Sequence, residues 1–550
     1  MNPVEALFEI LRSEGVDRVF GNPGTTELPF TDALVDRPGF EYVLGVQEAS
    51  VVSMADGYAR ATGAPSLVNL HVAAGLANGL IGMLNARRSR TPMVVTAGQQ
   101  DRRHLLDEPM LAGDLVGLAA AASKSAVEVQ HARDLPLVMR RAFALARRPP
   151  AGPVFVSIPM DLLAEAEEVT VPERSPVPIM GPATGVDDAV RLLAGAARPA
   201  IVAGDGVGRA GAVGDLVTVA EALGAAVYHQ PMHDGVDFPG NHPLHRGMLL
   251  PSYESVRTAL GSHDVVLLAG ARAFTAHHYS PGSPVPPGVA LVQLDDDPGE
   301  LGRNLPVRVA LLGGIRRTLA ELGAELTGRV PGAADRAAMI GADNAGERAD
   351  VDAAARATYG AAPLNPLGAA HALAAGLPAG AVVVEEAITT GMKLRSVLRL
   401  DEPGSFVHTV GGGLGWGIGA AVGTRMGRPD RPVVAALGDG CAMFGLQGLW
   451  SAARYRTPVL FVVFDNREYR TLKDTLDHGA SRSAATGRYV GLDLDPPVVD
   501  WAAAAATFEV PSVQVSSTDQ LRDVVAGAAA LSGPLLARVP ITGHPARRPG

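Results

Sequence analysis

The stretch Val433–Asn466 reads VVAALGDGCAMFGLQGLWSAARYRTPVLFVVFDN, and it decides the fold of the chain. Its two apolar runs, VVAAL and VLFVVF, are short and rich in β-branched residues, which is typical of strands buried on both faces. Between them, Met443–Tyr455 has the length and spacing of a single crossover helix. The stretch therefore predicts a strand–helix–strand unit within a parallel sheet.

Polar residues follow both predicted strands. Gly438-Asp439-Gly440 comes after the first strand, and Asp465-Asn466 ends the second. Because parallel strands end at the same edge of a sheet, the Asp439 carboxylate and the Asn466 amide should lie close together. Oxygen ligands beside a helix N-terminus suit a hard cation and an anionic phosphate. A lone GDG motif is better explained by a tight turn, but the second oxygen ligand on the neighbouring strand end favours a binding site.

The same alternation of strands and helices recurs along the whole chain and predicts three doubly wound α/β domains with parallel sheets. We expect an N-terminal domain at 1–172, a middle domain at 183–330 and a C-terminal domain at 363–545. The linkers are the proline-rich segment 172–185 and the segment 331–363, whose middle is expected to be partly helical. The predicted strands are 19–22, 42–46, 66–71, 93–98, 154–159, 199–204, 225–231, 264–271, 290–295, 381–386, 433–440, 459–466 and 534–540.

Composition narrows the class of function. Apolar residues make up 47% of the 550 residues, charged residues 19%, and the net charge is −10, which allows large cores and disfavours a nucleic-acid partner. The single cysteine, Cys441, excludes an internal disulfide and a thiolate zinc site. The N-terminal stretch is amphipathic and charged, unlike a signal peptide, and no apolar run reaches the roughly 20 residues of a membrane helix. A soluble, cytoplasmic protein is expected.

Three polar features follow successive strands of the N-terminal domain. The turn Gly21–Thr26 carries two hydroxyls, Glu48 opens a helix, and His71 ends a strand. Taken singly, Glu48 is explained by the preference of a carboxylate for a helix N-terminus, and His71 by a buried hydrogen bond. Together, a hydroxyl, a carboxylate and an imidazole at neighbouring strand ends predict part of an acid/base site.

The middle domain offers two weaker signals. Its GDGVGRAG segment, 204–211, follows a predicted strand as a dinucleotide motif does, but the loose spacing favours a plain turn. The pair His277-His278 follows another strand and could be surface residues, metal ligands or proton carriers. With no carboxylate or cysteine at ligand spacing, a metal is the least favoured of the three.

In these motifs the chain resembles, from end to end, the thiamine diphosphate-dependent 2-oxo acid decarboxylase and carboligase family. The GDG motif through Asn466 matches the diphosphate–magnesium motif of that family. The segments GNPGTTELPF, VQEASVVSMADGYA, NLHVAAG, VTAGQQ and GGGLGWGIGAAVG resemble its benzoylformate decarboxylase branch. The resemblance implies an N-terminal domain that binds the aminopyrimidine, a C-terminal domain that binds the diphosphate, and a tetramer whose sites lie between subunits.

The resemblance also implies roles for individual residues. Asp439, Asn466 and the Glu468 carbonyl would bind Mg²⁺, Glu48 would hydrogen-bond the aminopyrimidine, and His71 and His277 would carry protons. Thr25 would hydrogen-bond the substrate carboxylate. The remaining expected cofactor contacts are Gly412, Leu414, Thr389, Thr390, Gly438, Gly440 and Cys441. The implied reaction is the decarboxylation of a 2-oxo acid to an aldehyde, with carboligation to an acceptor aldehyde as a further activity, and nothing requires FAD.

Departures from the family pattern leave the substrate open. Thr25 stands where the benzoylformate decarboxylase branch has serine, and the added methyl group narrows the site. Near Thr475 and Leu476 an aromatic residue of the aryl pocket is missing, so aryl and aliphatic 2-oxo acids both remain candidates. Cys441 replaces a common serine and is expected to be a small buried residue. An acetolactate synthase-like carboligase, disfavoured by His71, and a non-catalytic relative are the alternatives.

Overall fold

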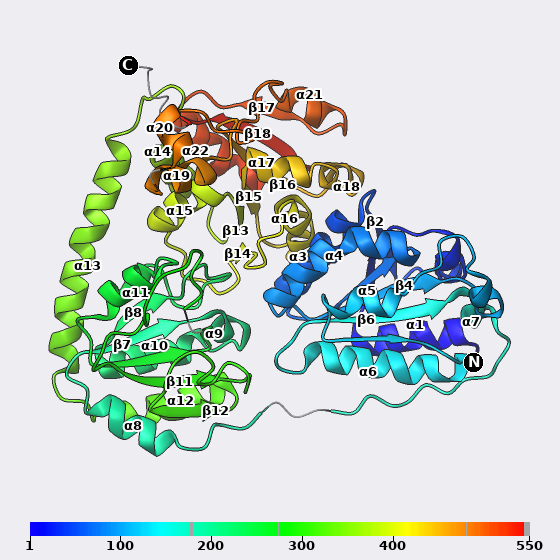
Figure 1. Ribbon diagram of the computed structural model, residues 1–550, viewed down its shortest axis with the longest axis horizontal. Coiled ribbons are helices and arrows are strands. Elements are labelled where there is room, and N and C mark those ends of the chain that lie inside the picture. The colour runs from blue at the N-terminus through cyan, green and yellow to red at the C-terminus, as the bar shows by residue number, and fades with distance from the viewer. Residues whose placement is uncertain (177–179, 273, 480, 544–550) are drawn as a thin grey trace. The chain divides into compact units, whose positions relative to one another are not determined.

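The computed structural model describes residues 1–176, 180–272, 274–479 and 481–543 (Figure 1). Residues 177–179 of the first expected linker and 544–545 of the last expected domain therefore lie outside the described residues. The chain forms two compact units. The larger comprises Met1–Pro176, Tyr359–Gly391 and Thr409–Gly550, and the smaller Val177–Thr358 and Met392–His408.

The first sheet has six parallel strands in the order β2-β1-β3-β4-β6-β5, with helices on its faces (Figure 1). Its strands are β1 (Arg18–Gly21), β2 (Glu41–Leu44), β3 (Ser66–Leu70), β4 (Met93–Gln99), β5 (Ser125–Glu128) and β6 (Pro153–Pro159). Its helices are α1 (Pro3–Glu14), α2 (Leu28–Ala33), α3 (Glu48–Thr62), α4 (Val72–Arg88), α5 (Leu115–Ala120), α6 (Leu135–Arg147) and α7 (Met160–Ala164), with 3-10 turns η1 (Thr25–Glu27), η2 (Leu34–Asp36), η3 (Arg102–Asp107) and η4 (Ala132–Asp134).

The second sheet, in the smaller unit, has the order β12-β11-β10-β7-β8-β9. Its strands are β7 (Pro199–Ala203), β8 (Ala226–His229), β9 (His245–Met248), β10 (Val265–Ala269), β11 (Ala290–Asp295) and β12 (Val309–Leu312). The helices of this part are α8 (Val186–Ala194), α9 (Asp205–Arg209), α10 (Val213–Leu223), α11 (Tyr253–Leu260), α12 (Ile315–Leu326) and α13 (Ala333–Arg356). Helix α13 has 24 residues, so the second expected linker is far more helical than its composition indicated.

The third sheet has the order β14-β13-β15-β16-β18-β17. Its strands are β13 (Val382–Glu386), β14 (Phe406–His408), β15 (Val433–Gly438), β16 (Val459–Asp465), β17 (Ser512–Gln514) and β18 (Leu535–Pro540). Its helices are α14 (Pro366–Gly376), α15 (Ile388–Val397), α16 (Trp416–Gly427), α17 (Asp439–Phe444), α18 (Gly448–Arg454), α19 (Arg470–His478), α20 (Arg482–Thr486), α21 (Trp501–Ala506) and α22 (Thr518–Ala526), followed by the 3-10 turn η5 (Gly527–Ala530).

The predicted fold class is confirmed, since all three sheets are parallel and flanked by helices. The sequence missed β5, β9, β12, β14 and β17, and each of them is the edge strand of its sheet. Edge strands such as β5 and β17 are only partly buried, so they lack the continuous apolar run that marks a central strand.

The prediction of a single crossover helix between β15 and β16 is wrong. The segment forms two short helices, α17 and α18, with a break at residues 445–447. At this break, a Cβ atom on Gly445 would lie 2.3 Å from the Gly415 carbonyl oxygen. The break itself is a turn in which the Gly448 N–H donates to the Gly445 carbonyl at 2.9 Å, and the close backbone contact explains why residue 445 is glycine.

Helices α3 and α16 join the first and third sheets of the larger unit. Trp416 of α16 donates from Nε1 to the Asp56 carboxylate of α3 at 2.5 Å. The helices approach so closely that a Cβ atom on Gly423 would lie 1.8 Å from the Met54 carbonyl oxygen, and one on Gly57 would lie 2.1 Å from that of Ala420. Glycine is therefore required at this crossing.

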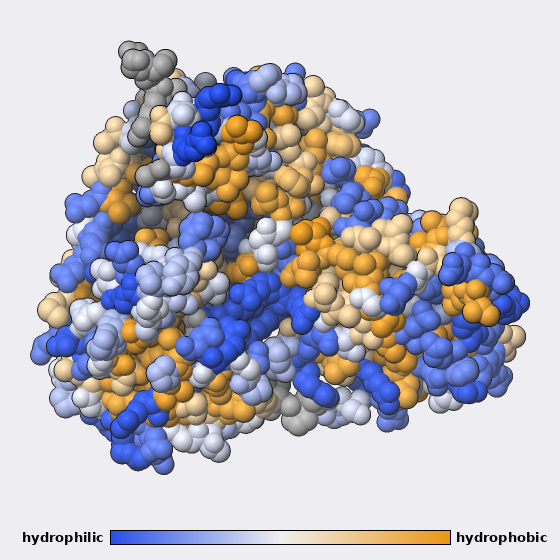
Figure 2. Space-filling view, viewed as in Figure 1, coloured by the Kyte–Doolittle hydropathy of each residue, from blue (hydrophilic) through white to orange (hydrophobic). Residues whose placement is uncertain are grey.

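The surface carries no continuous apolar band on the face shown in Figure 2, where apolar residues lie in separate patches among hydrophilic ones. Among the described helices, none combines the length and the apolar character that crossing a membrane requires.

We predict that Gly423→Ala lowers the melting temperature of the protein. The added methyl group forces α3 and α16 apart, and overpacking of this kind costs about 1–3 kcal/mol. Gly346→Ala is the matched control, because Gly346 lies in helix α13 with open space around it. Thermal unfolding followed by circular dichroism measures both variants, and equal melting temperatures for Gly423→Ala and the parent protein would contradict the tight crossing.

Candidate functional site

Glu48 is held at the start of α3 and faces α4. Gln47 caps the helix by accepting from the Ser50 N–H at 2.9 Å. The Glu48 carboxylate accepts from Asn78 Nδ2 at 3.0 Å. A Cβ atom on Gly75 would lie 3.2 Å from Glu48 Oε1, so the carboxylate lies against the first turns of α4.

His71 lies at the end of β3, directly before α4, and its ring is fixed by Glu27. The His71 Nδ1 atom lies 2.9 Å from Glu27 Oε2 and 3.1 Å from Thr26 Oγ1. Glu27 is 2% exposed and also accepts from the N–H groups of Gly24 and Gly98, each at 2.8 Å. A carboxylate partner at Nδ1 selects the tautomer with the proton on Nδ1 and leaves Nε2 free to exchange protons.

The backbone beside His71 is strained. Val72 has φ of 40°, which is an unfavourable conformation for a β-branched residue. Strain of this kind is maintained only where the surroundings fix the chain, and it is concentrated at functional sites. It supports the assignment of His71 to the site.

The structure places Thr26, and not the predicted Thr25, beside His71. Thr25 is exposed, while the hydroxyl that contacts His71 belongs to Thr26. Sequence reasoning also missed Glu27 and Asn78. Glu27 lies in the polar turn after β1, but its role depends on the adjacency of β1, β3 and β4, which the local sequence does not encode.

Asp439 joins the ends of β15 and β16. Its Oδ1 accepts from the Gly440 N–H at 2.9 Å, and its Oδ2 accepts from the Arg467 N–H at 2.6 Å. Asn466 Oδ1 accepts from the Glu468 N–H at 3.1 Å. Arg467, between the two predicted ligands, has φ of 59°, a second strained position. The expected pairing of Asp439 and Asn466 at one sheet edge is therefore observed.

The environment of Asp439 fits a cation. Burial raises the pKa of Asp439 to about 7, aided by the neighbouring Asp465, although the N–H groups of Gly440 and Arg467 act in the opposite direction. A divalent ion would favour the charged carboxylate. A buried carboxylate beside an amide oxygen is the type of donor set that Mg²⁺ accepts.

Glu468 has a backbone carbonyl group that could bind a metal ion, whereas Cys441 has a neutral, buried thiol. The Glu468 side chain is engaged by Lys473, which leaves its backbone carbonyl as the group expected to bind the ion. Burial raises the pKa of Cys441 well above its usual value, so the thiol is neutral and unreactive. A Cβ atom on Gly440 would lie 2.8 Å from the Tyr469 ring, which explains the second glycine of the motif.

Thr389 and Thr390 begin α15, directly after β13. Because β13 pairs in parallel with β15, both threonines lie at the sheet edge that carries Asp439. Thr390 is buried and Thr389 is half-buried. Their position is consistent with the expected cofactor contacts.

The loop with Gly412 and Leu414 is tied to helix α4. Asn85 Nδ2 donates to the Gly413 carbonyl at 2.9 Å, and Asn85 Oδ1 accepts from the Gly413 N–H at 3.0 Å. Gly412 has φ of 77°, which only glycine adopts readily. Asn85 was also missed by the sequence, since its partner lies more than 300 residues away.

Glu386 supports the same loop from the third sheet. Its carboxylate accepts from the N–H groups of Gly415 at 2.8 Å and Gly417 at 2.7 Å, at the start of α16. Burial raises the pKa of Glu386 to about 8, against the effect of these N–H donors. Glu386 therefore caps α16 and fixes the end of the Gly412 loop.

His71 and the Gly412 loop lie at opposite ends of α4, and Glu48 contacts the helix between them. His71 precedes the helix, whereas Asn85 and the Gly412 loop lie near its end. Fourteen helical residues span about 21 Å, at 1.5 Å per residue. Within one chain, His71 is therefore separated from the Asn85 bonds to this loop by most of the length of the helix. Glu48 is not, because it bonds to Asn78, three residues before Ile81, and a Cβ atom on Gly413 would lie 2.6 Å from the Ile81 side chain.

His277 lies in the smaller unit, in a loop after β10. It is exposed, its N–H donates to the Pro251 carbonyl at 3.0 Å, and its Nδ1 lies 3.0 Å from His278 Nε2. The GDGVGRAG segment forms the turn from β7 into α9. Its Gly208 N–H donates to Asp237.

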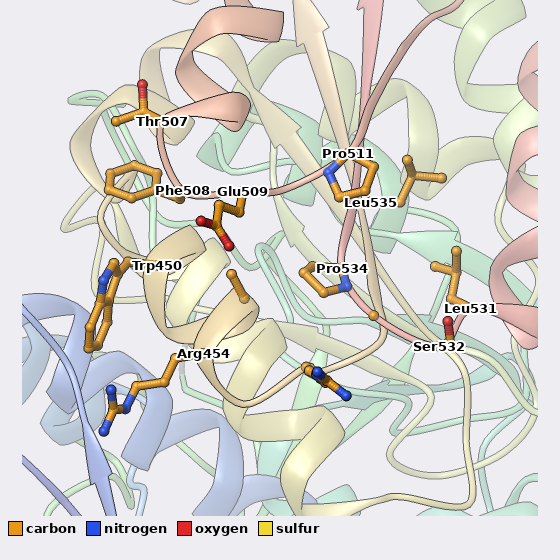
Figure 3. A pocket seen from close by; sticks show the side chains of 13 residues that line it. Trp450, Arg454, Thr507, Phe508, Glu509, Pro511, Leu531, Ser532, Pro534 and Leu535 are labelled. Atoms are coloured by element: carbon orange, nitrogen blue, oxygen red, sulfur yellow. The ribbon is translucent and has the colours of Figure 1, made fainter.

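A surface pocket of about 830 Å³ lies elsewhere in the larger unit (Figure 3). Its lining includes Trp450, Arg454, Phe508 and Pro534. It contains none of the residues that the sequence singled out, so it is separate from the candidate site.

Comparison with known families gives three matches along the chain. Residues 1–118 match the model described as "Thiamine pyrophosphate enzyme, N-terminal TPP binding domain". Residues 186–322 match the central domain of the same enzymes, and residues 389–539 match their C-terminal TPP binding domain.

Individual relatives match over nearly the whole chain. Benzoylformate decarboxylase of Pseudomonas aeruginosa is 35% identical over 97% of this chain and 98% of its own length. The acetolactate synthase large subunit of Haemophilus influenzae is 26% identical over 95% of this chain and 91% of its own.

Solved structures of similar proteins also match nearly the whole chain. The thiamine diphosphate-dependent 4-hydroxybenzoylformate decarboxylase of Rhodococcus jostii has a TM-score of 0.87 at 32% identity, covering 99% of this chain and 100% of its own. Benzoylformate decarboxylase of Polynucleobacter necessarius has a TM-score of 0.88 at 30% identity, covering 98% and 99%.

We predict that Mg²⁺ stabilises the protein more at pH 8 than at pH 5.5. The raised pKa of Asp439, about 7, means that its carboxyl group is largely protonated at the lower pH and competes poorly for the ion. Thermal unfolding with and without Mg²⁺ at the two pH values measures the difference.

Asp439→Asn should abolish this difference, whereas Asp519→Asn should retain it, because the Asp519 side chain is 73% exposed and pairs with Arg522. A Mg²⁺ effect that does not depend on pH, or that survives in Asp439→Asn, would exclude Asp439 as the ligand.

Proposed function

The chain belongs to the thiamine pyrophosphate enzyme family, and from that premise we propose that it decarboxylates a 2-oxo acid of the benzoylformate type to an aldehyde. The observation that carries the proposal is the His71–Glu27 pair. It supplies a positioned proton carrier in a chain that resembles benzoylformate decarboxylases along its whole length. The acetolactate synthase relatives make carboligation the second candidate activity.

We propose that Asp439, Asn466 and the Glu468 carbonyl hold Mg²⁺, and that Gly438, Gly440, Cys441, Thr389 and Thr390 surround the diphosphate. When bound, thiamine diphosphate supplies the electron sink that permits loss of carbon dioxide from a 2-oxo acid. The buried Asp439 and the strand-end Asn466 support this arrangement. Gly412 and Leu414 would contact the aminopyrimidine end.

The remaining residues would position the substrate and move protons. Glu48 would hydrogen-bond the aminopyrimidine, and Thr25 would hydrogen-bond the substrate carboxylate. His71 would exchange protons through Nε2, because Glu27 occupies Nδ1. His277, exposed on its loop, would be the second proton carrier.

A complete site would need two copies of the chain. In one chain, His71 precedes α4, while the Gly412 loop is bonded to Asn85 near the other end of this helix. A second copy that presents its own Gly412 loop to His71 would bring the two halves together. We therefore propose sites at a dimer interface within a homotetramer. The single cysteine is consistent with a reducing, cytoplasmic setting.

The proposed function is tested with a panel of 2-oxo acids, with and without acceptor aldehydes. We expect carbon dioxide and an aldehyde from a benzoylformate-type acid, and activity that disappears after chelation and cofactor removal and returns with thiamine diphosphate and Mg²⁺. A product limited to 2-hydroxyketones would favour the carboligase. Full turnover by the cofactor-free protein would exclude the proposal.

In the same assay, Glu48→Gln should lower kcat by about 10²-fold or more, as expected for loss of a group that takes part in proton transfer. Glu41→Gln is the control, because Glu41 lies on the edge strand β2 and bonds to Arg18 instead. Near-parental rates in Glu48→Gln would remove Glu48 from the proposed site.

Glu27→Gln tests whether Glu27 positions His71. Because Glu27 is buried and contacts the imidazole, we expect kcat to fall by about 10–100-fold, the range for loss of a supporting hydrogen bond, with KM little changed. A double-mutant cycle with His71→Ala provides the specific readout.

In the His71→Ala background, Glu27→Gln should cause no further loss, since the two residues act as one unit. Additive losses would mean that Glu27 acts only through stability of the domain.

A further inference from the structure

A buried cluster of His229, His233 and Asp237 lies in the smaller unit, at the end of β8 and in the loop that follows. His229 is 5% exposed and Asp237 is 1% exposed, while His233 is half-buried. One potential ligand atom from each of the three residues lies within 4.8 Å of the others. None of the three belongs to the site described above.

The ring of His233 presents a free lone pair at Nε2. Its Nδ1 lies 2.7 Å from the Gly235 carbonyl oxygen. A carbonyl can only accept, so Nδ1 carries the proton. The unprotonated Nε2 is the nitrogen through which a neutral imidazole binds a metal ion.

The ring of His229 is fixed in the same tautomer by His245. The His245 Nδ1 lies 3.3 Å from the Gly240 carbonyl and therefore carries a proton, so His245 Nε2 is an acceptor. His229 Nδ1 lies 2.8 Å from that Nε2 and must donate to it. The lone pair of His229 is thus on Nε2, where it meets only the Asp237 N–H at 3.3 Å.

This arrangement resembles the supporting shell of metal-binding histidines, which donate their second N–H to a fixed acceptor. Burial, together with the neighbouring His233, lowers the pKa of His229 well below its usual value, and burial, together with Arg395, does the same for His233. Both rings are therefore neutral, which is the form that binds metals.

Asp237 provides an unpartnered carboxylate oxygen. Its Oδ1 accepts from the Gly208 N–H at 3.1 Å, whereas its Oδ2 is buried without a hydrogen-bond partner in the described part of the chain. A buried acceptor left unsatisfied is costly, and more so when it is charged. Burial and the neighbouring Asp205 and Asp234 raise the pKa of Asp237 well above its usual value, against the effect of Arg209, and a bound cation would favour the charged carboxylate.

We propose that His229, His233 and Asp237 bind a divalent transition-metal ion through two imidazole nitrogens and one carboxylate oxygen. Imidazole nitrogens favour Zn²⁺ and similar ions over Mg²⁺ and Ca²⁺, which prefer oxygen ligands alone. Water would occupy the fourth position of a tetrahedral site.

Binding requires only small movements. Ligands of a tetrahedral Zn²⁺ ion at bond lengths of 2.0–2.1 Å lie about 3.3 Å apart, so the ligand atoms must close from at most 4.8 Å. The rings of His229 and His233 stack with centroids 4.2 Å apart and an interplanar angle of 19°, and they must rotate for their nitrogens to converge. The bound ion would tie the loop 230–244 to β8.

The experiment uses the full-length protein, stripped with a chelator and then supplied with excess Mg²⁺ and thiamine diphosphate. Zn²⁺ is titrated in competition with a chromophoric chelator, and Co²⁺ is used in parallel for its visible absorption. We expect one equivalent of Zn²⁺ per chain and a rise in melting temperature. His233→Gln should weaken Zn²⁺ binding by at least 100-fold and abolish the rise.

His263→Gln is the matched control, because His263 is a partly buried histidine of the same unit that bonds to Tyr228 and the Arg198 carbonyl instead. It should bind Zn²⁺ as the parent protein does. Asp439→Asn should also retain the Zn²⁺ equivalent, since it removes only the proposed Mg²⁺ ligand at the strand ends.

Three results would overturn the proposal. They are a parent protein that takes up no stoichiometric Zn²⁺, undiminished binding in His233→Gln, and loss of the Zn²⁺ equivalent in Asp439→Asn. Asp237→Asn should behave as His233→Gln does. If it fails to fold, His233→Gln decides the outcome alone, because His233 is only half-buried and its substitution is the milder one.

Discussion

The hydrogen bonds of Asp439 are the interaction on which the candidate site depends. One carboxylate oxygen accepts from the Gly440 N–H, and the other accepts from the Arg467 N–H beyond the end of the neighbouring strand. Both strand ends are thereby fixed around a single buried carboxylate, whose pKa is raised to about 7 by burial. Parallel pairing of β15 and β16 makes this possible, because only parallel strands deliver both ends to the same edge.

Helix α4 contacts both the Gly412 loop and Glu48, and it begins directly after His71. The glycine-lined crossing of α3 and α16 fixes the N-terminal and C-terminal sheets of the larger unit against each other. The paired hydrogen bonds from Asn85 then hold the Gly412 loop near the C-terminal end of α4, away from His71 at its start. The proposed second copy of the chain would present such a loop to His71.

The smaller unit contains a separate cluster of buried histidine and aspartate side chains. Its buried histidines and aspartates are arranged by hydrogen bonds that select one tautomer for each ring, as in His245, His229 and His233. The GDGVGRAG turn, which resembles a nucleotide motif, instead supplies the Gly208 N–H to Asp237. In this protein an N–H group of the glycine motif therefore donates to an aspartate side chain of the same chain.

The sequence by itself determined the central strands, their parallel arrangement and the residues that follow them, including Glu48, His71, Asp439 and Asn466. These features are local, because a buried strand is a continuous apolar run and its end is marked by the next polar residue. Only the tertiary structure decided the edge strands other than β2, the interrupted crossover and the partners Glu27, Asn85 and Asp237. Those contacts depend on the order of strands in a sheet and on close helix crossings, which bring together residues distant in the chain.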